Sequence, residues 1–135
     1  MRRLPLLLLL ALGCAAPVPP PTDTGAKDAA KRFYSAIISK DWAAAQDLVS
    51  ADAKRKLTRE QFARLAADHR KAFGFEPDAV TVHAIDEHGA EAVAHVTISG
   101  KGHARHRFKD ALTLRKGADG WQVVLPASFG HPGKP

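Results

Sequence analysis

The chain has 135 residues, of which 45% are hydrophobic and 25% are charged, a composition typical of one small globular domain with a single core. Its formal net charge of +6 falls to +4 if Arg2 and Arg3 are lost with a signal peptide, and the remaining basic residues are interleaved with acidic ones. No stacking aromatic motif accompanies the positive charge, so we expect no nucleic-acid partner.

Residues 1–13 have the three parts of an export signal. Arg2 and Arg3 form a positively charged start, residues 4–12 form an apolar stretch, and a small residue stands at the cut site. This apolar stretch is too short for a transmembrane helix, which needs roughly 20 residues. We therefore expect residues 1–13 to be a signal peptide that is removed.

The end of the apolar stretch resembles the lipobox of bacterial lipoproteins, through the residues Leu10-Ala11-Leu12-Gly13-Cys14. In that family a diacylglyceryl group is added to the cysteine thiol, and Cys14 is the single cysteine of this chain. The resemblance implies that Cys14 becomes the lipid-bearing first residue and anchors the protein stably in a membrane. The alternative is an ordinary signal cut near Ala15 and Ala16, which would leave a soluble periplasmic protein.

Residues 14–23 contain four prolines and almost nothing that could be buried. Such a segment favours an extended, polyproline-like tether of about 3.1 Å per residue. We expect it to hold a folded domain over residues 24–130 away from the membrane, with a disordered tail over residues 131–135. The lipid would place the protein in the cell envelope, on the outside of the cytoplasmic membrane. Ala15, where enterobacterial lipoproteins carry an aspartate as retention signal, would favour the outer membrane facing the periplasm if the source has two membranes.

Helical periodicity begins with the folded region. Asp23 or Thr24 can cap a first helix, in which apolar residues recur every three to four positions. Asp41 is then positioned to cap a short second helix over residues 42–49, and Ser50 can cap one further turn. The sequence therefore predicts short amphipathic helices that each bury one face.

Thr58 and Gln61 fit a capping box, which marks the start of a well-defined helix. Its apolar stripe includes Phe62 and His69, and Gly74 can take the left-handed conformation that ends it. We interpret His69 on this stripe as a hydrogen-bonded core or boundary residue rather than as a ligand or a base.

After Pro77 the hydrophobic period changes from about 3.6 to 2. Four strand-like segments are separated by glycine turns, at residues 79–85, 90–99, 103–115 and 121–125. Short connections favour an antiparallel meander. Helices followed by strands indicate an α+β domain in which the helices cover one face of the sheet.

Two early segments resemble the NTF2-like domains that include ketosteroid isomerase, namely AAKRFYSAI at residues 29–37 and KDWAAA at 40–45. Two later ones are similar to small NTF2-like, SnoaL-like lipoproteins of the envelope, namely LTREQF at 57–62 and DGWQVV at 119–124. The resemblance implies N-terminal helices packed on a curved four-stranded antiparallel sheet, the NTF2-like cone. Cystatin-like and other α+β meanders are the alternative folds.

Members of the NTF2-like fold often carry a pocket between sheet and helices, and they range from enzymes to binding modules. The residues of this chain that would line such a pocket are Phe33, Tyr34, Ile37, Trp42, Phe62 and Trp121. In the isomerase branch a tyrosine of the first helix contacts the oxyanion and an aspartate moves the proton. Counted back from the break at Asp41, the position of that tyrosine is occupied here by Phe33, and Tyr34 is the next residue.

The acid and base that proton transfer needs are not evident in the sequence. No carboxylate is expected at an apolar position of a helix or strand, since Asp86, Glu87 and Asp119 are assigned to turns and Asp41 to a helix cap. We therefore assign no catalytic residue.

Histidine is frequent, with seven in the chain, and four lie in predicted strands: His83, His95, His103 and His106. Strand alternation groups His83 with Thr81 and Ile85 on one face. No metal-type ligand spacing occurs, and Arg105 and Arg107 would repel a cation, so we expect no metal site. The pattern instead favours a polar, solvent-facing side of the sheet that gains positive charge below about pH 6.5.

The sequence thus predicts a membrane-anchored lipoprotein of the cell envelope with a non-catalytic NTF2-like domain and no cofactor. That domain would bind a small apolar or anionic ligand or an envelope protein, and a homodimer is a further alternative. The competing hypothesis is an NTF2-like enzyme of the isomerase or cyclase type that acts on a small apolar substrate.

Overall fold

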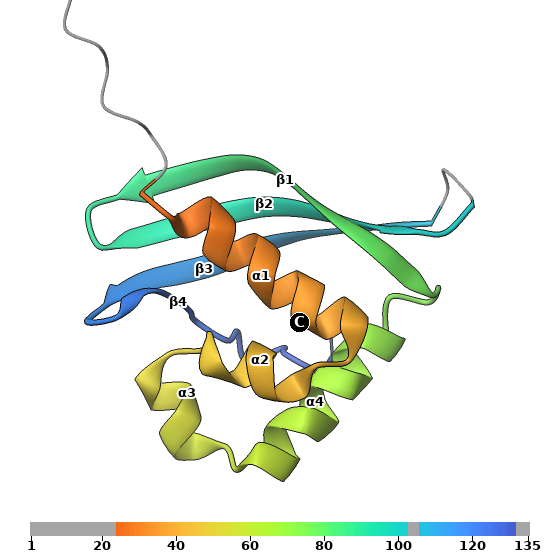
Figure 1. Cartoon of the computed structure of the whole chain (residues 1–135), viewed down its shortest axis with the longest axis horizontal. Coiled ribbons are helices and arrows are strands. Elements are labelled where there is room, and N and C mark those ends of the chain that lie inside the picture. Colours follow the sequence, from red (N-terminus) through yellow and green to blue (C-terminus); the bar gives the residue numbers. More distant parts are fainter. Residues whose placement is uncertain (1–23, 103–105, 132–135) are drawn as a thin grey trace, which may run out of the picture.

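The computed structural model describes residues 24–102 and 106–131, in which four helices precede four strands (Figure 1). The helices are α1 (Ala26–Ser39), α2 (Trp42–Asp47), α3 (Ala51–Lys56) and α4 (Arg59–Lys71). The strands are β1 (Pro77–His88), β2 (Glu91–Gly100), β3 (Arg107–Gly117) and β4 (Gly120–Val123). The predicted signal peptide, Cys14, the tether and all but the first residue of the predicted tail lie outside the described residues.

Three of the predicted helix caps are confirmed. The side chain of Asp41 accepts a hydrogen bond from the backbone N–H of Ala44 at 3.2 Å, and Ser50 caps α3 in the same way. Thr58 and Gln61 form both hydrogen bonds of the capping box that begins α4. These caps depend on residues three apart in the chain, so they can form independently of the rest of the fold.

The start of α1 differs from the prediction. Its N-cap is Gly25, with φ of 109° and no side-chain hydrogen bond, so the cap assigned to Thr24 is wrong. Thr24 is instead bonded to Glu87 of β1 and to the indole N–H of Trp121. Tertiary contacts thus fix the chain just before the helix begins.

The strands form one antiparallel meander in the order β1-β2-β3-β4, as predicted. The assignment of Asp86 and Glu87 to a turn is wrong, because β1 continues to His88, which pairs with Glu91. Only two residues connect these strands, and Gly89 has the positive φ of 62° that such a tight hairpin favours.

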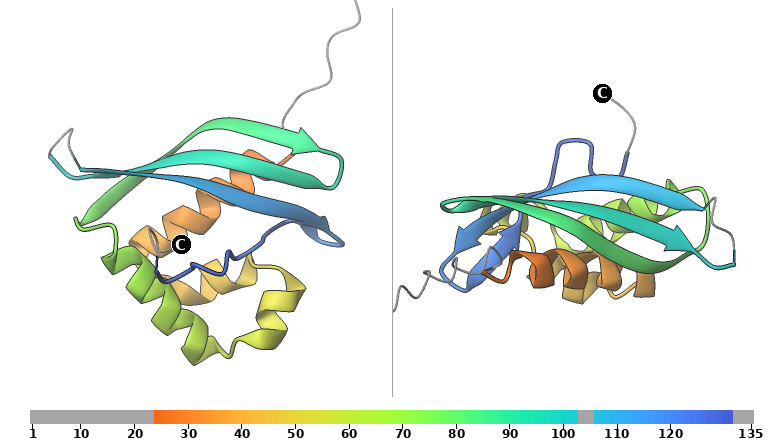
Figure 2. Two further views of the ribbon diagram at one scale, coloured as in Figure 1. Left: turned by 180° about the vertical axis from the view of Figure 1, so that it is seen from behind. Right: turned by 90° about the horizontal axis from the view of Figure 1, so that it is seen from above.

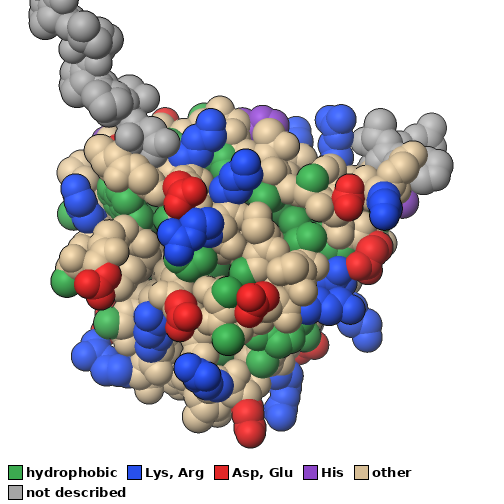
Figure 3. Space-filling view, viewed as in Figure 1, with side chains coloured by type: hydrophobic (Ala, Val, Ile, Leu, Met, Phe, Trp, Pro, Cys, Tyr) green, Lys and Arg blue, Asp and Glu red, His purple; other side chains and the backbone are tan. Residues whose placement is uncertain are grey.

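The sheet and the helices form two layers with the core between them (Figure 2). Helix α1 lies along one face of the sheet, and α4 closes one side of the helical layer. After β4 the chain crosses from the sheet to α4, where Phe129 stacks on Phe62 with ring centres 5.8 Å apart (Figure 2). Basic and acidic side chains are interspersed on the face that carries α1 (Figure 3). In the part of the chain that the structure describes, no helix has both the length and the apolar character that crossing a membrane requires.

Candidate functional site

The interior contains a hydrogen bond between Tyr34 of α1 and Asp110 of β3. The Tyr34 side chain is 1% exposed, and its hydroxyl donates to a carboxylate oxygen of Asp110. Asp110 shares the inward face of β3 with Phe108 and Leu112, because side chains alternate along a strand. The expectation that no carboxylate occupies an inward-facing position is therefore wrong.

This environment keeps the Tyr34 hydroxyl protonated. Burial raises its pKa well above the usual 10, and the negative charge of Asp110 and the hydrogen bond to it raise the pKa further. The hydroxyl is therefore a permanent donor at physiological pH. Its donated hydrogen bond satisfies one carboxylate oxygen of Asp110, which is half-buried.

His69 of α4 lies beside this pair. It is 4% exposed, and its Nδ1 accepts a hydrogen bond from the backbone N–H of Gly130 at 3.3 Å, which confirms the prediction of a hydrogen-bonded core histidine. A neutral ring with an accepting Nδ1 carries its proton on Nε2, and this buried atom has no partner among the described residues. Burial lowers the pKa of His69, while the charge of Asp110 acts in the opposite direction.

Tyr34, Asp110 and His69 together form what we call the buried cluster. The rings of Tyr34 and His69 are 6.4 Å apart, and Phe129 stacks on His69 at 4.7 Å. A tyrosine, a carboxylate and a histidine are groups that can take part in proton transfer, although no hydrogen bond between described residues connects His69 to the other two. However, the Tyr34 hydroxyl can contact a substrate oxygen only if its bond to Asp110 breaks and the aromatic packing around it opens.

The structure divides the six predicted pocket residues into two sets. Four of them lie together in the core, each at most 1% exposed: Phe33, Tyr34, Ile37 and Phe62. Trp121 is 8% exposed, and its indole N–H donates to Thr24 at 2.9 Å. Trp42 is partly exposed at the start of α2. The two tryptophans thus line separate surface grooves.

The groove beside Trp42 has a volume of about 490 Å³, and we call it the Trp42 groove. Its other lining residues come from the end of α1, from α4 and from the segment before β1: Lys40, Ala67, Arg70, Lys71, Gly74, Phe75 and Glu76. Sequence reasoning identified Trp42 but none of these as site residues. These residues do not form one short sequence motif, because they come from three separate segments of the chain.

Arg70 is the fixed charge in this groove. Its side chain is 12% exposed, Nε donates to the carbonyl of Ile38 at 3.2 Å, and the guanidinium forms an ion pair with Glu76. The hydrogen bond from Arg70 is the largest cause that lowers the pKa of Glu76; desolvation opposes it, and the positive charges of Arg70 and Lys40 lower the pKa further. Glu76 is therefore ionised at neutral pH and orients Arg70.

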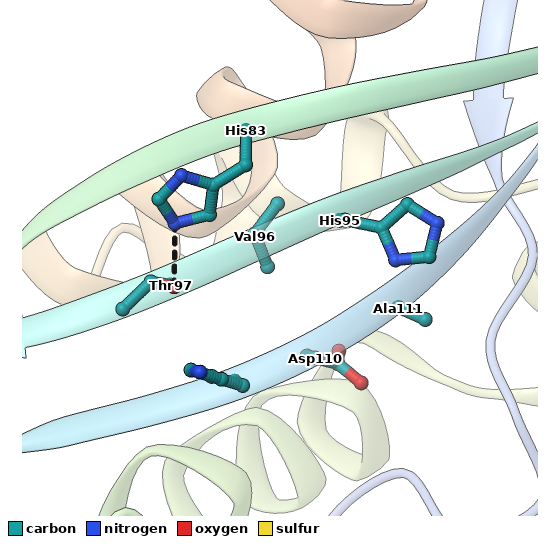
Figure 4. Close-up of a pocket in the computed structure, with 7 residues that line it drawn as sticks. His83, His95, Val96, Thr97, Asp110 and Ala111 are labelled. Carbon is teal, nitrogen blue, oxygen red and sulfur yellow. Dashed lines mark hydrogen bonds between the residues drawn. The ribbon is translucent and has the colours of Figure 1, made fainter.

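A second groove, of about 430 Å³, lies on the face of the sheet that carries His83 and His95 (Figure 4). His83 Nε2 is hydrogen bonded to Thr97 Oγ1 at 2.7 Å, and His95 Nε2 lies 3.0 Å from a carboxylate oxygen of Asp86. The expected grouping of His83 with Ile85 is wrong, because an irregularity between Val82 and Ala84 reverses the alternation of β1.

Of the other two strand histidines, only His106 is among the described residues, and it does not line this groove. His103 lies outside the described residues, and His106 stacks on Phe75 with ring centres 5.5 Å apart. Within residues 24–102 and 106–131, no group of three histidine, cysteine or acidic side chains is arranged to hold a metal ion.

Comparison with known proteins identifies the fold and the family. The crystal structure of a "Putative NTF2-like transpeptidase" from Campylobacter jejuni is similar, with a TM-score of 0.60 and 13% sequence identity over 73% of this chain and 96% of that one. At this identity the similarity shows the fold alone, and it confirms the expected NTF2-like α+β architecture. No curated protein is significantly similar in sequence. A family model described as "Putative lumazine-binding" matches residues 24–127. The chain therefore belongs to this lumazine-binding-like family and has an NTF2-like fold.

Proposed function

We propose that this protein is a lipoprotein of the cell envelope, anchored through Cys14, whose NTF2-like domain binds a small ligand without transforming it. The lipobox-like residues 10–14 support the anchor. The description of the family as lumazine-binding supports a small ligand. The proline-rich residues 14–23 would let the domain stand up to about 30 Å from the membrane surface.

The observation that carries the non-catalytic part is the state of Tyr34. It is the tyrosine whose position comes nearest to that of a catalytic hydroxyl in the isomerases, yet it is 1% exposed and donates to Asp110. A donor that is already used in the interior cannot stabilise an oxyanion on a substrate. The grooves, by contrast, are open at the surface and have volumes within the range of small-molecule sites.

The anchor is tested by mass spectrometry of the mature N-terminus together with membrane fractionation. We expect the wild-type chain to begin at a lipid-modified Cys14 and to stay with the membrane, and Cys14→Ser to be released. An unmodified chain that starts at Ala16 or later, and is released equally with and without the substitution, would overturn the anchor.

Ligand binding is tested by equilibrium dialysis of the full chain carrying Cys14→Ser, with lumazine as the first probe and other small heteroaromatic compounds after it. We expect saturable binding, with the compound recovered chemically unchanged. Conversion of the compound in proportion to protein concentration would refute a non-catalytic role.

An isomerase is the second candidate, and the buried cluster favours it, because a tyrosine, a carboxylate and a histidine meet in the interior of an NTF2-like fold. It predicts that the protein converts a β,γ-unsaturated ketone to the conjugated ketone, followed by ultraviolet absorbance, and that Tyr34→Phe abolishes this activity. Under the binding-only proposal the wild-type protein and Tyr34→Phe give the same background rate.

A further inference from the structure

We propose that the Trp42 groove is the ligand site and that it takes a planar aromatic molecule bearing an anionic group. This inference rests on the proposed small-ligand function and adds to it the place and the chemical class. The site is distinct from the space between sheet and helices, since the side chains of the buried cluster do not line it.

Two aromatic side chains line the groove from different elements. Trp42 begins α2, and its position is set by the Asp41 cap. Phe75 precedes β1, and its ring stacks on those of His106 and Phe73, with ring centres 5.5 Å and 6.2 Å away. Both side chains are partly exposed and line the groove, so each presents apolar aromatic surface to a flat ligand.

The remaining lining leaves room between these rings. Ala67 and Gly74 contribute almost no side chain, and Gly74, with φ of 80°, has no atom within 4 Å of the point where a Cβ would stand. The volume of about 490 Å³ suits a small molecule of two or three fused rings better than a protein segment.

The charge of the groove selects the ligand further. Three cationic side chains and one carboxylate line it, so it carries an excess of positive charge: Lys40, Arg70, Lys71 and Glu76. Glu76 is bound by Arg70 and also interacts with Lys40, whereas Lys71 forms no ion pair with any residue that the structure describes. Lys71 is therefore available to an anionic group on the ligand.

The position of the groove favours a ligand in solution over a lipid headgroup. Helix α1 begins beside Thr24, where the predicted tether would join the domain, and the groove lies at its other end (Figure 1). The 14 residues of α1 span about 21 Å at 1.5 Å per residue. The groove is thus far from the point at which the chain would leave for the membrane.

The experiment is an NMR titration of the full chain carrying Cys14→Ser. The chain has two tryptophans, so two indole N–H signals are expected, and Trp121→Phe assigns them. The probe is 2-naphthoate, with cyclohexanecarboxylate and 2-naphthalenemethanol as the non-aromatic and the uncharged comparison. We expect 2-naphthoate to shift the Trp42 signal saturably, and each comparison compound to bind at least about fivefold more weakly.

Two variants locate the site. Lys71→Glu removes the available cation, and Phe75→Leu replaces an aromatic wall with an aliphatic one; each should weaken 2-naphthoate binding by about fivefold or more. Lys31→Glu, a charge reversal at another exposed lysine, on α1 and outside the groove, should leave the affinity unchanged.

Each other result contradicts the inference. If the Trp42 signal does not move, or if Lys71→Glu and Lys31→Glu weaken binding equally, the Trp42 groove is not the site. Saturable binding of a dialysis probe without any change at Trp42 would leave the proposed ligand-binding function intact and refute only this location.

Discussion

Asp110 lies between Phe108 and Leu112 on the inward face of β3, where a carboxylate without a partner would be costly. The Tyr34 hydroxyl compensates part of this cost, and the two residues connect α1 to the sheet across the core. The sequence contains a sign of this buried position, because Asp110 alternates along the strand with the apolar residues Phe108, Leu112 and Leu114. The other alternating positions of β3 carry polar side chains such as Arg107, Lys109 and Arg115.

Because Tyr34 is the single tyrosine of the chain, its ionisation can be followed directly by absorbance near 295 nm. We expect no tyrosinate around pH 10 in the folded protein, and a normal titration near 10 in denaturant. Because the folded state holds the Tyr34 proton more tightly than the unfolded state does, this group's contribution to stability is fully present below pH 10. The contribution is lost as the pH rises through the pKa of the folded state. Asp110→Asn should lower the Tyr34 pKa without bringing it to 10, since burial, the larger cause, remains. An unchanged pKa in Asp110→Asn would contradict the pairing.

His69 gives a second prediction, at acidic pH. Its folded pKa is lowered from 6.5, so the unfolded chain takes up a proton that the folded chain does not. The free energy of unfolding should therefore fall as the pH drops below 6.5, by at most about 1.4 kcal/mol per pH unit, and level off below the folded pKa. In urea denaturation, His69→Gln should reduce this slope, because glutamine does not take up a proton in this pH range. Its amide oxygen can still accept the hydrogen bond from the Gly130 N–H. His131→Gln, at an exposed position, should retain it.

At the scale of elements, α4 is the one whose start is most clearly defined by local sequence. Its capping box satisfies two backbone donors, and Phe62 and Ala66 then bury one face against the core. Thr58→Ala should lower stability by about 1 kcal/mol, which corresponds to a decrease in Tm of about 4 °C or more. Thr58→Ser keeps the hydroxyl and should stay close to wild type. Equal losses in the two variants would indicate that the methyl group, and not the cap, is responsible.

Elements that depend on neighbouring residues could be predicted, and those that depend on distant pairing could not. Asp41, Ser50 and the Thr58 capping box were correct because each cap bonds to a backbone group three residues away. The predicted alternation of β1 was wrong after His83, because the irregularity between Val82 and Ala84 arises from the pairing with β2.

The candidate site follows the same rule. Trp42 could be named from a local pattern, but Phe75 and Arg70 become its neighbours only when α4 packs beside the end of α1. Arg70 reaches the carbonyl of Ile38, 32 positions earlier in the chain. No spacing in a single sequence indicates such a contact. The groove could therefore be found only from the fold.

At the scale of the whole molecule, Thr24 is the first residue that the structure describes, and it is bonded to Glu87 and Trp121 next to the start of α1. If the preceding residues act only as a tether, the lipidated chain in vesicles and the Cys14→Ser chain should unfold at the same temperature, within about 2 °C.

Thr24→Val provides the contrast to that comparison. It removes the hydroxyl that accepts from the Trp121 indole N–H at 2.9 Å and donates to Glu87, so it should lower stability by about 1–2 kcal/mol in both forms of the protein. Differential scanning calorimetry of the four samples separates the two effects. A lipid-dependent change in Tm that Thr24→Val abolishes would mean that the tether transmits membrane attachment into the domain, contrary to its role as a passive spacer.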